Sequence, residues 1–307
     1  MLERLGPYTN LRILIGEVLA VWPGHADFVA KSFGPRSESD MQTSERLASM
    51  ILALAGDALR RSTENYQWTC NRLADEFLYF YREGTYRRKT NAAAYEYVYN
   101  NPEFMEKYVN GLLLTQVMWK NQFDAFSVLS REFVGFLKDQ YRHLEIGPGH
   151  GLLLREIATR EGCVHAEGWD ISTTSLEQTR KCLRLLGCTQ EVILKQVNAE
   201  EIGGTDEHGF DSVVISEVLE HVERPGLVLD NLRRQMNDGG RLFVNIPINS
   251  PAPDHIYLLR APQEVSELVR RAGFKIVHEH HFPMTGYTLE RALKRDATVS
   301  CVIIAEK

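Results

Sequence analysis

The chain has 307 residues, a net charge of −6, 44% hydrophobic residues and 25% charged residues. This composition is typical of a globular protein with a sizeable core, and the negative charge argues against broad nucleic-acid binding, which needs a basic surface. Because no stretch is long and apolar enough to span a membrane and the five cysteines form no C-x-x-C pair, we expect a cytoplasmic protein with reduced thiols and no membrane or nucleic-acid partner.

The first third of the chain has a helical pattern, with apolar residues at helical spacing. Asn101 and Pro102 form a helix-start signal, because asparagine caps the first amides and proline suits the first helical position. We predict a helical unit over residues 1–120 that packs on the rest of the chain. The predicted helices cover residues 11–22, 41–61, 64–81, 104–118 and 123–138.

Tyrosines and basic residues are concentrated in one part of this unit, and two interpretations remain open. They form either core aromatics with a solvated basic loop, or a lid in which aromatic faces stabilise a bound cation and arginines hold a carboxylate. The residues concerned are Tyr79, Tyr81, Tyr86, Tyr95, Tyr97, Tyr99, Arg82, Arg87, Arg88 and Lys89.

A glycine-rich turn follows the first predicted strand. Gly147, Gly149 and Gly151 stand at every second position, immediately before a predicted helix at residues 152–159. Glycines let the backbone turn sharply and let a ligand approach bare peptide, while the first amides of the helix face that ligand. This arrangement predicts a nucleotide-type pocket at the carboxyl end of the strand.

The turn departs from the dinucleotide-binding fingerprint G-x-G-x-x-G. The third glycine comes one residue early, and Leu152 stands in its place. Glu145 precedes the first glycine by two residues, where its carboxylate would repel a pyrophosphate and attract an ammonium group. The pattern therefore favours a ligand with a positively charged group over a dinucleotide.

Strands and helices alternate after this turn, which predicts a mostly parallel sheet with helices on both faces. Asp170 ends the second strand, 19 residues beyond Gly151, where such folds place an acid for ribose hydroxyls. We also predict a turn at residues 237–240. The later strands are predicted at residues 191–197, 210–215, 241–246, 275–280 and 298–306, and the helices at 172–186, 227–236 and 262–272.

The motif Glu145-x-Gly147-x-Gly149-x-Gly151, followed by Asp170, resembles the class I S-adenosylmethionine (SAM) methyltransferases, in their small-molecule branch. The resemblance covers about residues 120–307. It implies a Rossmann-like α/β fold with a seven-stranded sheet and an antiparallel last strand. We expect an N-terminal all-helical lid or cap domain over residues 1–120 and a SAM-binding catalytic domain over 121–307.

The resemblance also implies the cofactor contacts. Glutamate and glycines of the motif would hold the methionine moiety of SAM, the aspartate the ribose, and the residues after the second and third strands the adenine. The family commonly has an acid where this chain has Asn198, whose amide oxygen can still accept a hydrogen bond. The cofactor-binding residues predicted in this way are Glu145, Gly147, Gly149, Gly151, Asp170, Ile171, Asn198, Ala199 and Ser216.

The catalytic candidates lie after the fourth and fifth strands. Glu217 stands at the edge of the methyl-transfer site, and His255 and Tyr257 lie in a long loop that overhangs the pocket in this fold. His255 is either a general base oriented by a carboxylate or a loop histidine in solvent. His278 and His280 share one strand face, but no further ligand in the sequence completes a set, so we expect no metal site.

Three functions fit this pattern. The first is a SAM-dependent methyltransferase of secondary metabolism that acts on a small polar metabolite, with a possible homodimer. The second is a SAM-consuming cyclase that resembles the azetidine-2-carboxylate synthases and releases methylthioadenosine by intramolecular displacement. The third is a non-catalytic SAM-binding or partner-binding module.

Overall fold

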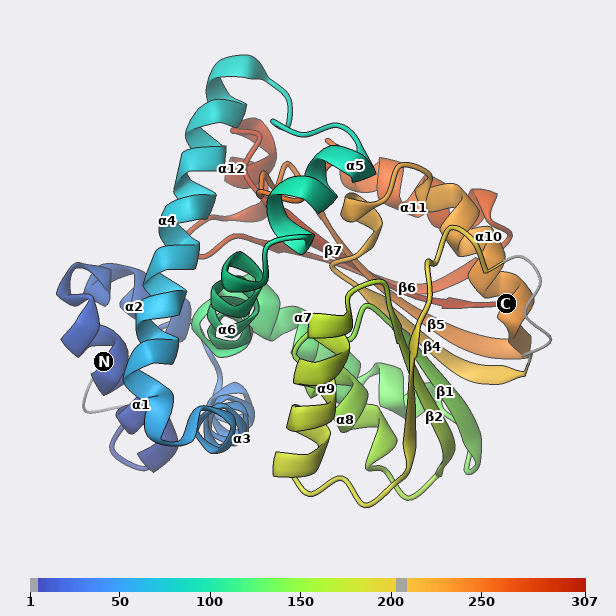
Figure 1. Cartoon of the computed structure of the whole chain (residues 1–307), viewed down its shortest axis with the longest axis horizontal. Helices are drawn as coiled ribbons and strands as arrows, with labels where there is room; N and C mark the ends of the chain where they lie inside the picture. Colours follow the sequence, from blue (N-terminus) through green and yellow to red (C-terminus); the bar gives the residue numbers. More distant parts are fainter. Residues whose placement is uncertain (1–4, 203–208) are drawn as a thin grey trace.

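A seven-stranded sheet with helices on both faces forms the carboxyl-terminal part of the computed structural model, which describes residues 5–202 and 209–307 (Figure 1). The strand order is β3-β2-β1-β4-β5-β7-β6, and β7 is antiparallel to both neighbours. The predicted Rossmann-like fold class, including the antiparallel last strand, is thereby confirmed. The strands are β1 (Tyr141–Ile146), β2 (Cys163–Asp170), β3 (Val192–Gln196), β4 (Phe210–Ser216), β5 (Met236–Ile248), β6 (Lys275–Pro283) and β7 (Val299–Glu306).

The two faces of the sheet carry separate hydrophobic cores. Successive side chains on a strand point to opposite faces, so Val214 packs in one core and Val213 and Ile215 in the other. One face is covered by α7 (Lys120–Arg131), α8 (Leu152–Ala158) and α9 (Thr173–Leu185), and the other by α10 (Pro225–Gln235), α11 (Pro262–Arg271) and α12 (Leu289–Lys294).

The helical unit, residues 5–118, packs on the α7–α9 face and shares its core (Figure 1). Its last helix is separated from α7 by Trp119, whose extended backbone (ψ 128°) interrupts the helix. α7 contacts β6 and β7, so it is part of the helical layer that covers the sheet. The helices of the unit are α1 (Thr9–Val21), α2 (Ala26–Phe33), α3 (Glu38–Ala55), α4 (Leu59–Glu83), α5 (Asn91–Ala94), the π-helical turn η4 (Tyr95–Tyr99) and α6 (Pro102–Met118).

Most predicted boundaries shift by a few residues, and three predictions differ more widely from the structure. The break between the second and third predicted helices lies at Gly56, whose φ of +51° ends α3 several residues earlier than predicted. The predicted helix 123–138 ends at Arg131. Residues 237–240 lie inside β5 rather than in a turn. There, Gly239 adopts a φ of +72° and the register with β4 shifts, as in a β-bulge.

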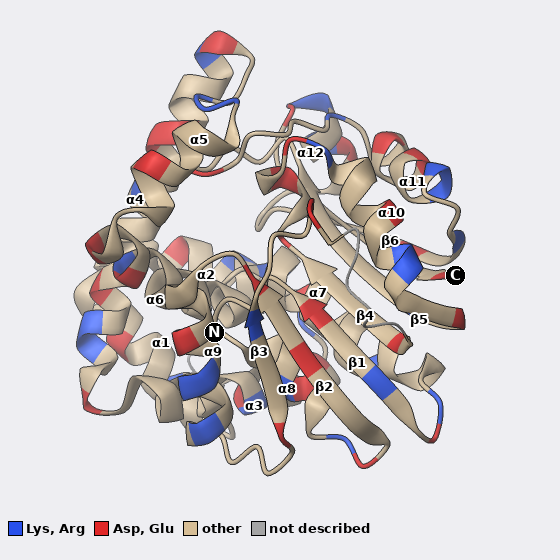
Figure 2. Ribbon diagram, turned by 45° about the vertical axis from the view of Figure 1, so that its right-hand side comes forward, with Lys and Arg blue, Asp and Glu red and all other residues tan. Residues whose placement is uncertain are grey.

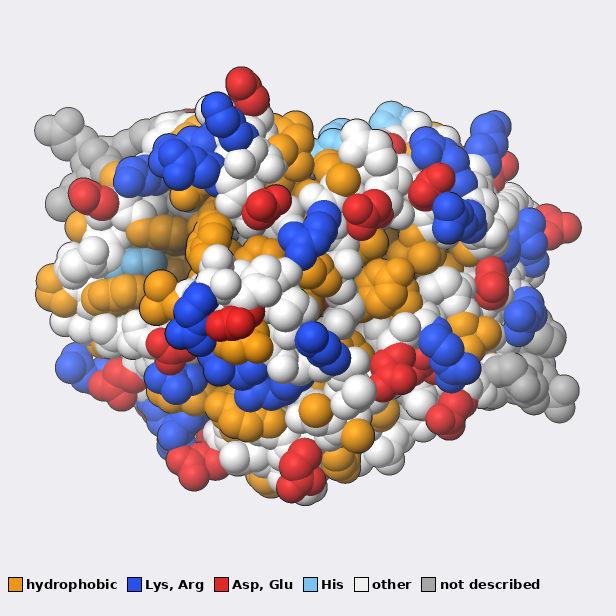
Figure 3. All heavy atoms as spheres, turned by 90° about the horizontal axis from the view of Figure 1, so that it is seen from above, with side chains coloured by type: hydrophobic (Ala, Val, Ile, Leu, Met, Phe, Trp, Pro, Cys, Tyr) orange, Lys and Arg blue, Asp and Glu red, His pale blue; other side chains and the backbone are white. Residues whose placement is uncertain are grey.

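The described surface carries charges of both signs. Lys and Arg residues are interspersed with Asp and Glu residues along the helices and strands (Figure 2). Seen from above, hydrophobic side chains lie between these charges (Figure 3). The exposed hydrophobic side chains at the end of the helical unit include Leu78 and Tyr81 on α4 and Tyr95 on η4. Among the described residues, no helix combines the length and the hydropathy needed to cross a bilayer.

Candidate active site

The glycine turn lies where β1 and β4 are neighbours and their connections leave in opposite directions, which is where open α/β sheets bind ligands. Gly147 adopts a φ of +65°, and its amide donates to the carbonyl oxygen of Trp169 at 2.8 Å. A Cβ on Gly147 would lie 2.4 Å from Cγ2 of Val218. Close packing as well as backbone geometry therefore requires glycine at this position.

Gly149 and Gly151 have different surroundings. Gly149 adopts a φ of +52° and lines the cavity beside the turn. Gly151 caps α8, and a Cβ there would lie 3.1 Å from the Cα of Thr179 on α9. The structure thus brings the first two glycines to the cavity and places the third against α9, although all three were predicted to bind the cofactor.

A cavity of about 460 Å³ extends from the glycine turn along the ends of β2 and β3. We call it the nucleoside compartment. Four predicted cofactor residues line it besides the glycines: Asp170, Ile171, Asn198 and Ala199. Tyr95 and Tyr99 of the helical unit form part of the opposite wall.

Asp170 is held in place by the backbone around it. Its carboxylate accepts a hydrogen bond from the amide of Ser172 at 2.8 Å and further ones from the amides of Gly149 and Ile171. Burial nevertheless raises the pKa of Asp170 to about 6. An acceptor-only group at this depth is suited to a ligand that donates two neighbouring hydroxyl groups.

Asn198 uses its side chain locally as well as lining the cavity. Its Oδ1 accepts from the amide of Glu200 at 3.0 Å, and its Nδ2 donates to Glu201 at 2.9 Å. Since an amide oxygen has two lone pairs, one remains for a ligand. The adenine contact of Asn198 stays a prediction.

Glu145 lies at the end of β1 and lines a second, contiguous compartment of about 160 Å³. The side chain is buried, and Oε2 accepts no hydrogen bond from any residue in the described part of the chain. Burial, and then the charge of Asp170, raise the pKa of Glu145 well above its usual range. A ligand that brought a positive charge to this carboxylate would satisfy it.

The second compartment, which we call the acceptor compartment, also brings together Ser216, Glu217 and His255. Glu217 has a φ of +54°, which is rare for a residue with a side chain and is typical of functional positions. Its carboxylate accepts from Nδ2 of Asn245 at 3.0 Å, and burial raises its pKa to about 7. Glu217 can therefore accept a proton near neutral pH.

His255 and Tyr257, the two catalytic candidates of the loop, are in different environments. His255 is buried, with Nδ1 at the carbonyl oxygen of Ser250. Burial, and then the neighbouring His221, lower its pKa to about 3, so it would be a weak general base. Tyr257 lines neither compartment; it packs on the core of the α10–α12 face, and its amide donates to the carbonyl oxygen of Glu220.

A clasp of hydrogen bonds between the helical unit and the loop after β5 forms part of the walls of the two compartments. Asp254 accepts hydrogen bonds from the hydroxyl groups of Tyr99 at 3.2 Å and Tyr108 at 3.1 Å. Nearby, Asn91 donates to Glu200 and Glu223, which lie on the sheet side. The sequence analysis missed Asp254 and Tyr108, because residues 146 positions apart in the chain leave no local signal.

The basic residues near the tyrosines do not reach the compartments. Arg87 and Arg88 form ion pairs with Glu76, and the guanidinium of Arg88 stacks on the ring of Tyr97 at 3.7 Å. Tyr95 and Tyr99, which line the nucleoside compartment, therefore agree with the interpretation as a lid. Arg87 and Arg88 do not hold a ligand carboxylate; they pair with a glutamate of the helical unit itself.

We expect that removing both hydroxyl groups of the clasp, in Tyr99→Phe/Tyr108→Phe, weakens SAM binding roughly tenfold, because charge-assisted hydrogen bonds contribute about 1.5–3 kcal/mol. Amide hydrogen exchange of residues 91–109 should become faster. Tyr97→Phe, on the exposed side of the same segment, is the matched control. Unchanged exchange and affinity in the double variant would show that the clasp is not needed for closure.

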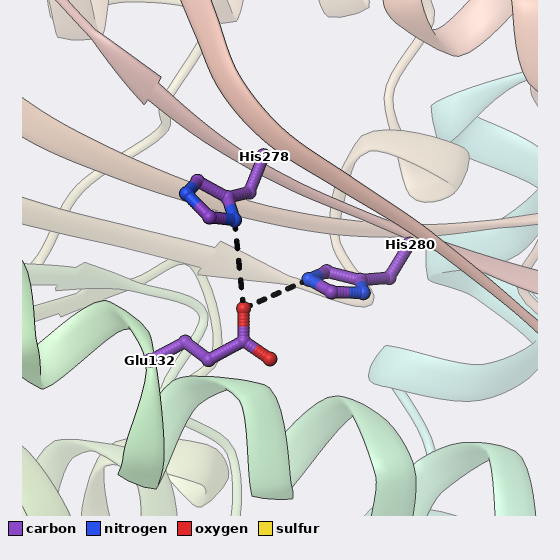
Figure 4. Close-up of side chains that lie close together, drawn as sticks. All are labelled: Glu132, His278 and His280. Carbon is purple, nitrogen blue, oxygen red and sulfur yellow. Dashed lines mark hydrogen bonds and ion pairs between the residues drawn. The ribbon is translucent and has the colours of Figure 1, made fainter.

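A cluster of histidines lies on the edge strand β6 (Figure 4). Oε2 of Glu132, just beyond α7, lies 2.9 Å from Nε2 of His280 and 3.7 Å from Nδ1 of His278. The structure thus supplies a carboxylate that the sequence did not show, although each of these side chains is partly exposed. His281 pairs separately with Glu279.

Comparisons with known proteins agree with this fold. Residues 118–296, more than half of the chain, match a family profile described as a methyltransferase domain. A curated relative from Alkalilimnicola ehrlichii, named ubiquinone biosynthesis O-methyltransferase, is 34% identical over 110 residues, which are 36% of this chain and 43% of the relative. A relative of the same name from Marinobacter nauticus is 26% identical over 53% of this chain and 76% of its own. The chain spans about half the length of most of these relatives.

Two solved structures share the fold. The phosphoethanolamine N-methyltransferase 2 of Haemonchus contortus, in complex with SAM, has a TM-score of 0.53 at 14% identity and covers 72% of this chain and 60% of its own. The structure titled "PigF with SAH" has a TM-score of 0.53 at 17% identity and covers 81% of this chain and 74% of its own. The second match includes more than residues 121–307 alone, so it extends into the helical unit.

Proposed function

The chain belongs to the SAM-dependent methyltransferase family, and from this premise we propose that it transfers the methyl group of SAM to a hydroxyl oxygen of a small polar molecule. The observation that carries the proposal is the acceptor compartment, which adjoins the nucleoside compartment and is lined by Glu217. The O-methyltransferase names of the curated relatives support oxygen as the acceptor atom.

The proposed binding mode follows from the charges of the cavity. Glu145 would hold the ammonium group of the methionine moiety, and the backbone at Gly147 and Gly149 would lie against its chain. Asp170 would accept from the ribose hydroxyls, and Ile171 would pack on the adenine. The sulfonium would then face Ser216 and Glu217, at the opening into the acceptor compartment.

The reaction is an in-line displacement, in which positioning and exclusion of water do most of the work. A lone pair of the acceptor oxygen forms a bond to the methyl carbon, and the carbon–sulfur bond breaks with both electrons going to sulfur. S-adenosylhomocysteine (SAH) leaves. The hydroxyl proton passes to Glu217, whose pKa of about 7 suits a proton acceptor.

A cyclase is the second candidate, and the small size of the acceptor compartment favours it. In this reaction the amino nitrogen of the methionine moiety forms a bond to its own Cγ, and the Cγ–sulfur bond breaks. Sulfur keeps the electron pair and leaves as methylthioadenosine. The ammonium group would first pass a proton to Glu145, whose raised pKa permits protonation.

Incubation with SAM, alone and with a mixture of hydroxylated metabolites, separates the two by the nucleoside that is released. We expect SAH, only in the presence of an acceptor, and Glu217→Gln should lower kcat by about 10²-fold or more while SAH affinity stays unchanged. Asp170→Ala, which lacks the ribose contact, should lose SAM binding instead. Methylthioadenosine from SAM alone would identify the cyclase, and no turnover of either kind would leave a binding module.

A further inference from the structure

Three potential metal ligands converge at the wall of the acceptor compartment. Glu220 and His221 belong to the 3₁₀ turn η6 (Leu219–His221), and His255 comes from the loop after β5. Nε2 of His221 lies 3.7 Å from Oε1 of Glu220, and Nε2 of His255 lies 3.9 Å from the same oxygen. The three ligand atoms all lie within 4.8 Å of one another.

Glu220 makes this group unusual among the carboxylates of the protein. It is fully buried, and neither of its side-chain oxygens accepts a hydrogen bond from the residues that the structure describes. Distances of 3.7 and 3.9 Å are too long for hydrogen bonds. They are close to the separation of about 3.4 Å that tetrahedral ligands adopt when each lies about 2.1 Å from a zinc ion.

The other nitrogen of each histidine has a partner that orients the ring. Nδ1 of His221 lies 3.3 Å from Oδ2 of Asp254 and 3.2 Å from its carbonyl oxygen, and Nδ1 of His255 lies at the carbonyl oxygen of Ser250. When Nδ1 carries the proton and donates it to these oxygens, Nε2 presents its lone pair toward Glu220. Metal-binding histidines are held in this way by carboxylates and backbone carbonyls.

The backbone holds the two segments in register. The amides of Ile256 and Tyr257 both donate to the carbonyl oxygen of Glu220 at 2.9 Å. The ligands are therefore fixed relative to one another by hydrogen bonds that do not involve their own side chains. Tyr257, predicted as catalytic, contributes here through its backbone.

We propose that Glu220, His221 and His255 bind one divalent transition-metal ion of the zinc type, whose open coordination position faces the acceptor compartment. Three protein ligands leave that position for an oxygen of the acceptor, which the positive charge would polarise. This last role depends on the proposed methyl transfer, whereas metal binding does not. The proposal departs from the expectation, drawn from the sequence, that the protein has no metal site.

The surface cluster of Glu132, His278 and His280 is the internal comparison. There the carboxylate is partly exposed and already accepts a hydrogen bond from His280 at 2.9 Å, so it needs no further partner. In the buried cluster the carboxylate is enclosed and the rings are oriented. The buried cluster is therefore the one built for a metal.

The test is a titration of the full chain, stripped with a chelator, with Co²⁺, whose visible absorption reports its coordination. We expect one strongly bound equivalent. Its affinity should fall by at least about 100-fold in Glu220→Gln and in His255→Ala, since changes even beyond the direct ligands cost 10–100-fold. His280→Ala, at the surface cluster, should bind Co²⁺ as the wild type does. Circular dichroism of each variant checks folding, and Glu220→Gln keeps the shape of the side chain.

Two results would overturn the proposal: Co²⁺ affinity unchanged in folded Glu220→Gln and His255→Ala, or affinity lost in His280→Ala alone. Calorimetry with SAH on the same samples separates this proposal from the proposed function. If SAH does not bind the wild type but the buried cluster still binds Co²⁺, the methyltransferase proposal fails and the metal site stands.

Discussion

Gly147→Ala is expected to weaken SAH binding by about 100-fold or more. The added Cβ would lie 2.4 Å from Cγ2 of Val218, and the backbone at this position has a φ of +65°. A left-handed backbone costs roughly 1–2 kcal/mol for a residue with a Cβ, and overpacking typically costs 1–3 kcal/mol. Relief requires a shift of Val218, which lines the nucleoside compartment, or of the peptide that would lie against the cofactor, so either change alters the proposed binding site. Calorimetric titration with SAH measures the loss.

Gly187→Ala is the matched control for this variant. Gly187 has nearly the same φ, +66°, but a Cβ there would have no described neighbour within 4 Å, and the residue lies beyond α9, away from both compartments. Its substitution should cost stability without changing SAH affinity. Equal affinities for Gly147→Ala and the wild type would mean that the turn does not approach the cofactor.

Glu145→Gln is expected to weaken SAM binding roughly 10- to 100-fold and yet to stabilise the protein without ligand. The loss follows because a charge-assisted hydrogen bond to the ammonium group, about 1.5–3 kcal/mol, would be replaced by a weaker one. The gain follows because glutamine has nearly the same shape and is neutral in both states, whereas the ionised carboxyl of the unfolded chain must take up a proton to be buried. Calorimetry gives the first effect, and thermal unfolding without ligand gives the second.

The effect on stability should depend on pH with a defined sign. Below the usual pKa of 4.5 the carboxyl of Glu145 is protonated in the folded and unfolded chains, so its ionisation does not affect stability. As the pH rises, the unfolded chain ionises first while the folded chain keeps its proton, because burial raises the folded pKa well above 4.5. The free energy of unfolding therefore falls with rising pH, and the Tm advantage of Glu145→Gln should grow.

Glu156→Gln is the matched control for a buried glutamate. Glu156 is buried too, but it is paired with Arg46 and Arg160 and lines neither compartment. Neutralising it removes two ion pairs, so the variant should lose stability and keep SAM affinity. The interpretation of Glu145 would be wrong if both variants lost stability, or if Glu145→Gln bound SAM as tightly as the wild type does.

Gly147→Ala tests whether the glycine turn approaches the cofactor, and Glu145→Gln tests whether a buried carboxylate binds its positive charge. Glu145, Asp170 and Glu217 are carboxylates that line the two adjoining compartments, and burial raises the pKa of all three. Acids in a shared enclosed site cost stability unless a ligand compensates them. The sulfonium and ammonium groups of SAM carry the charge that would do so.

The sequence by itself determined the features that depend on consecutive residues. The alternation of strands and helices, the glycine turn with Glu145 before it, and Asp170 at the end of the next strand are local patterns, because side-chain period and turn chemistry act over a few positions. They were sufficient for the fold class and for the six predicted cofactor residues that line the nucleoside compartment, Gly147, Gly149, Asp170, Ile171, Asn198 and Ala199. The ends of the helices were predicted less well. Gly56 lay inside the predicted helix 41–61, but its positive φ ends α3 there, and the sequence does not show which glycine adopts that conformation.

Only the tertiary structure decided which distant side chains meet. The clasp joins Tyr99 and Tyr108 to Asp254, and the three proposed metal ligands join a short turn after β4 to a loop after β5. The tertiary structure also decided that Tyr257 packs in the core of the α10–α12 face and that Arg87 forms an ion pair with Glu76. Such contacts form because the sheet stacks its strand ends at one edge and the helical unit packs against it, and no local periodicity records that packing.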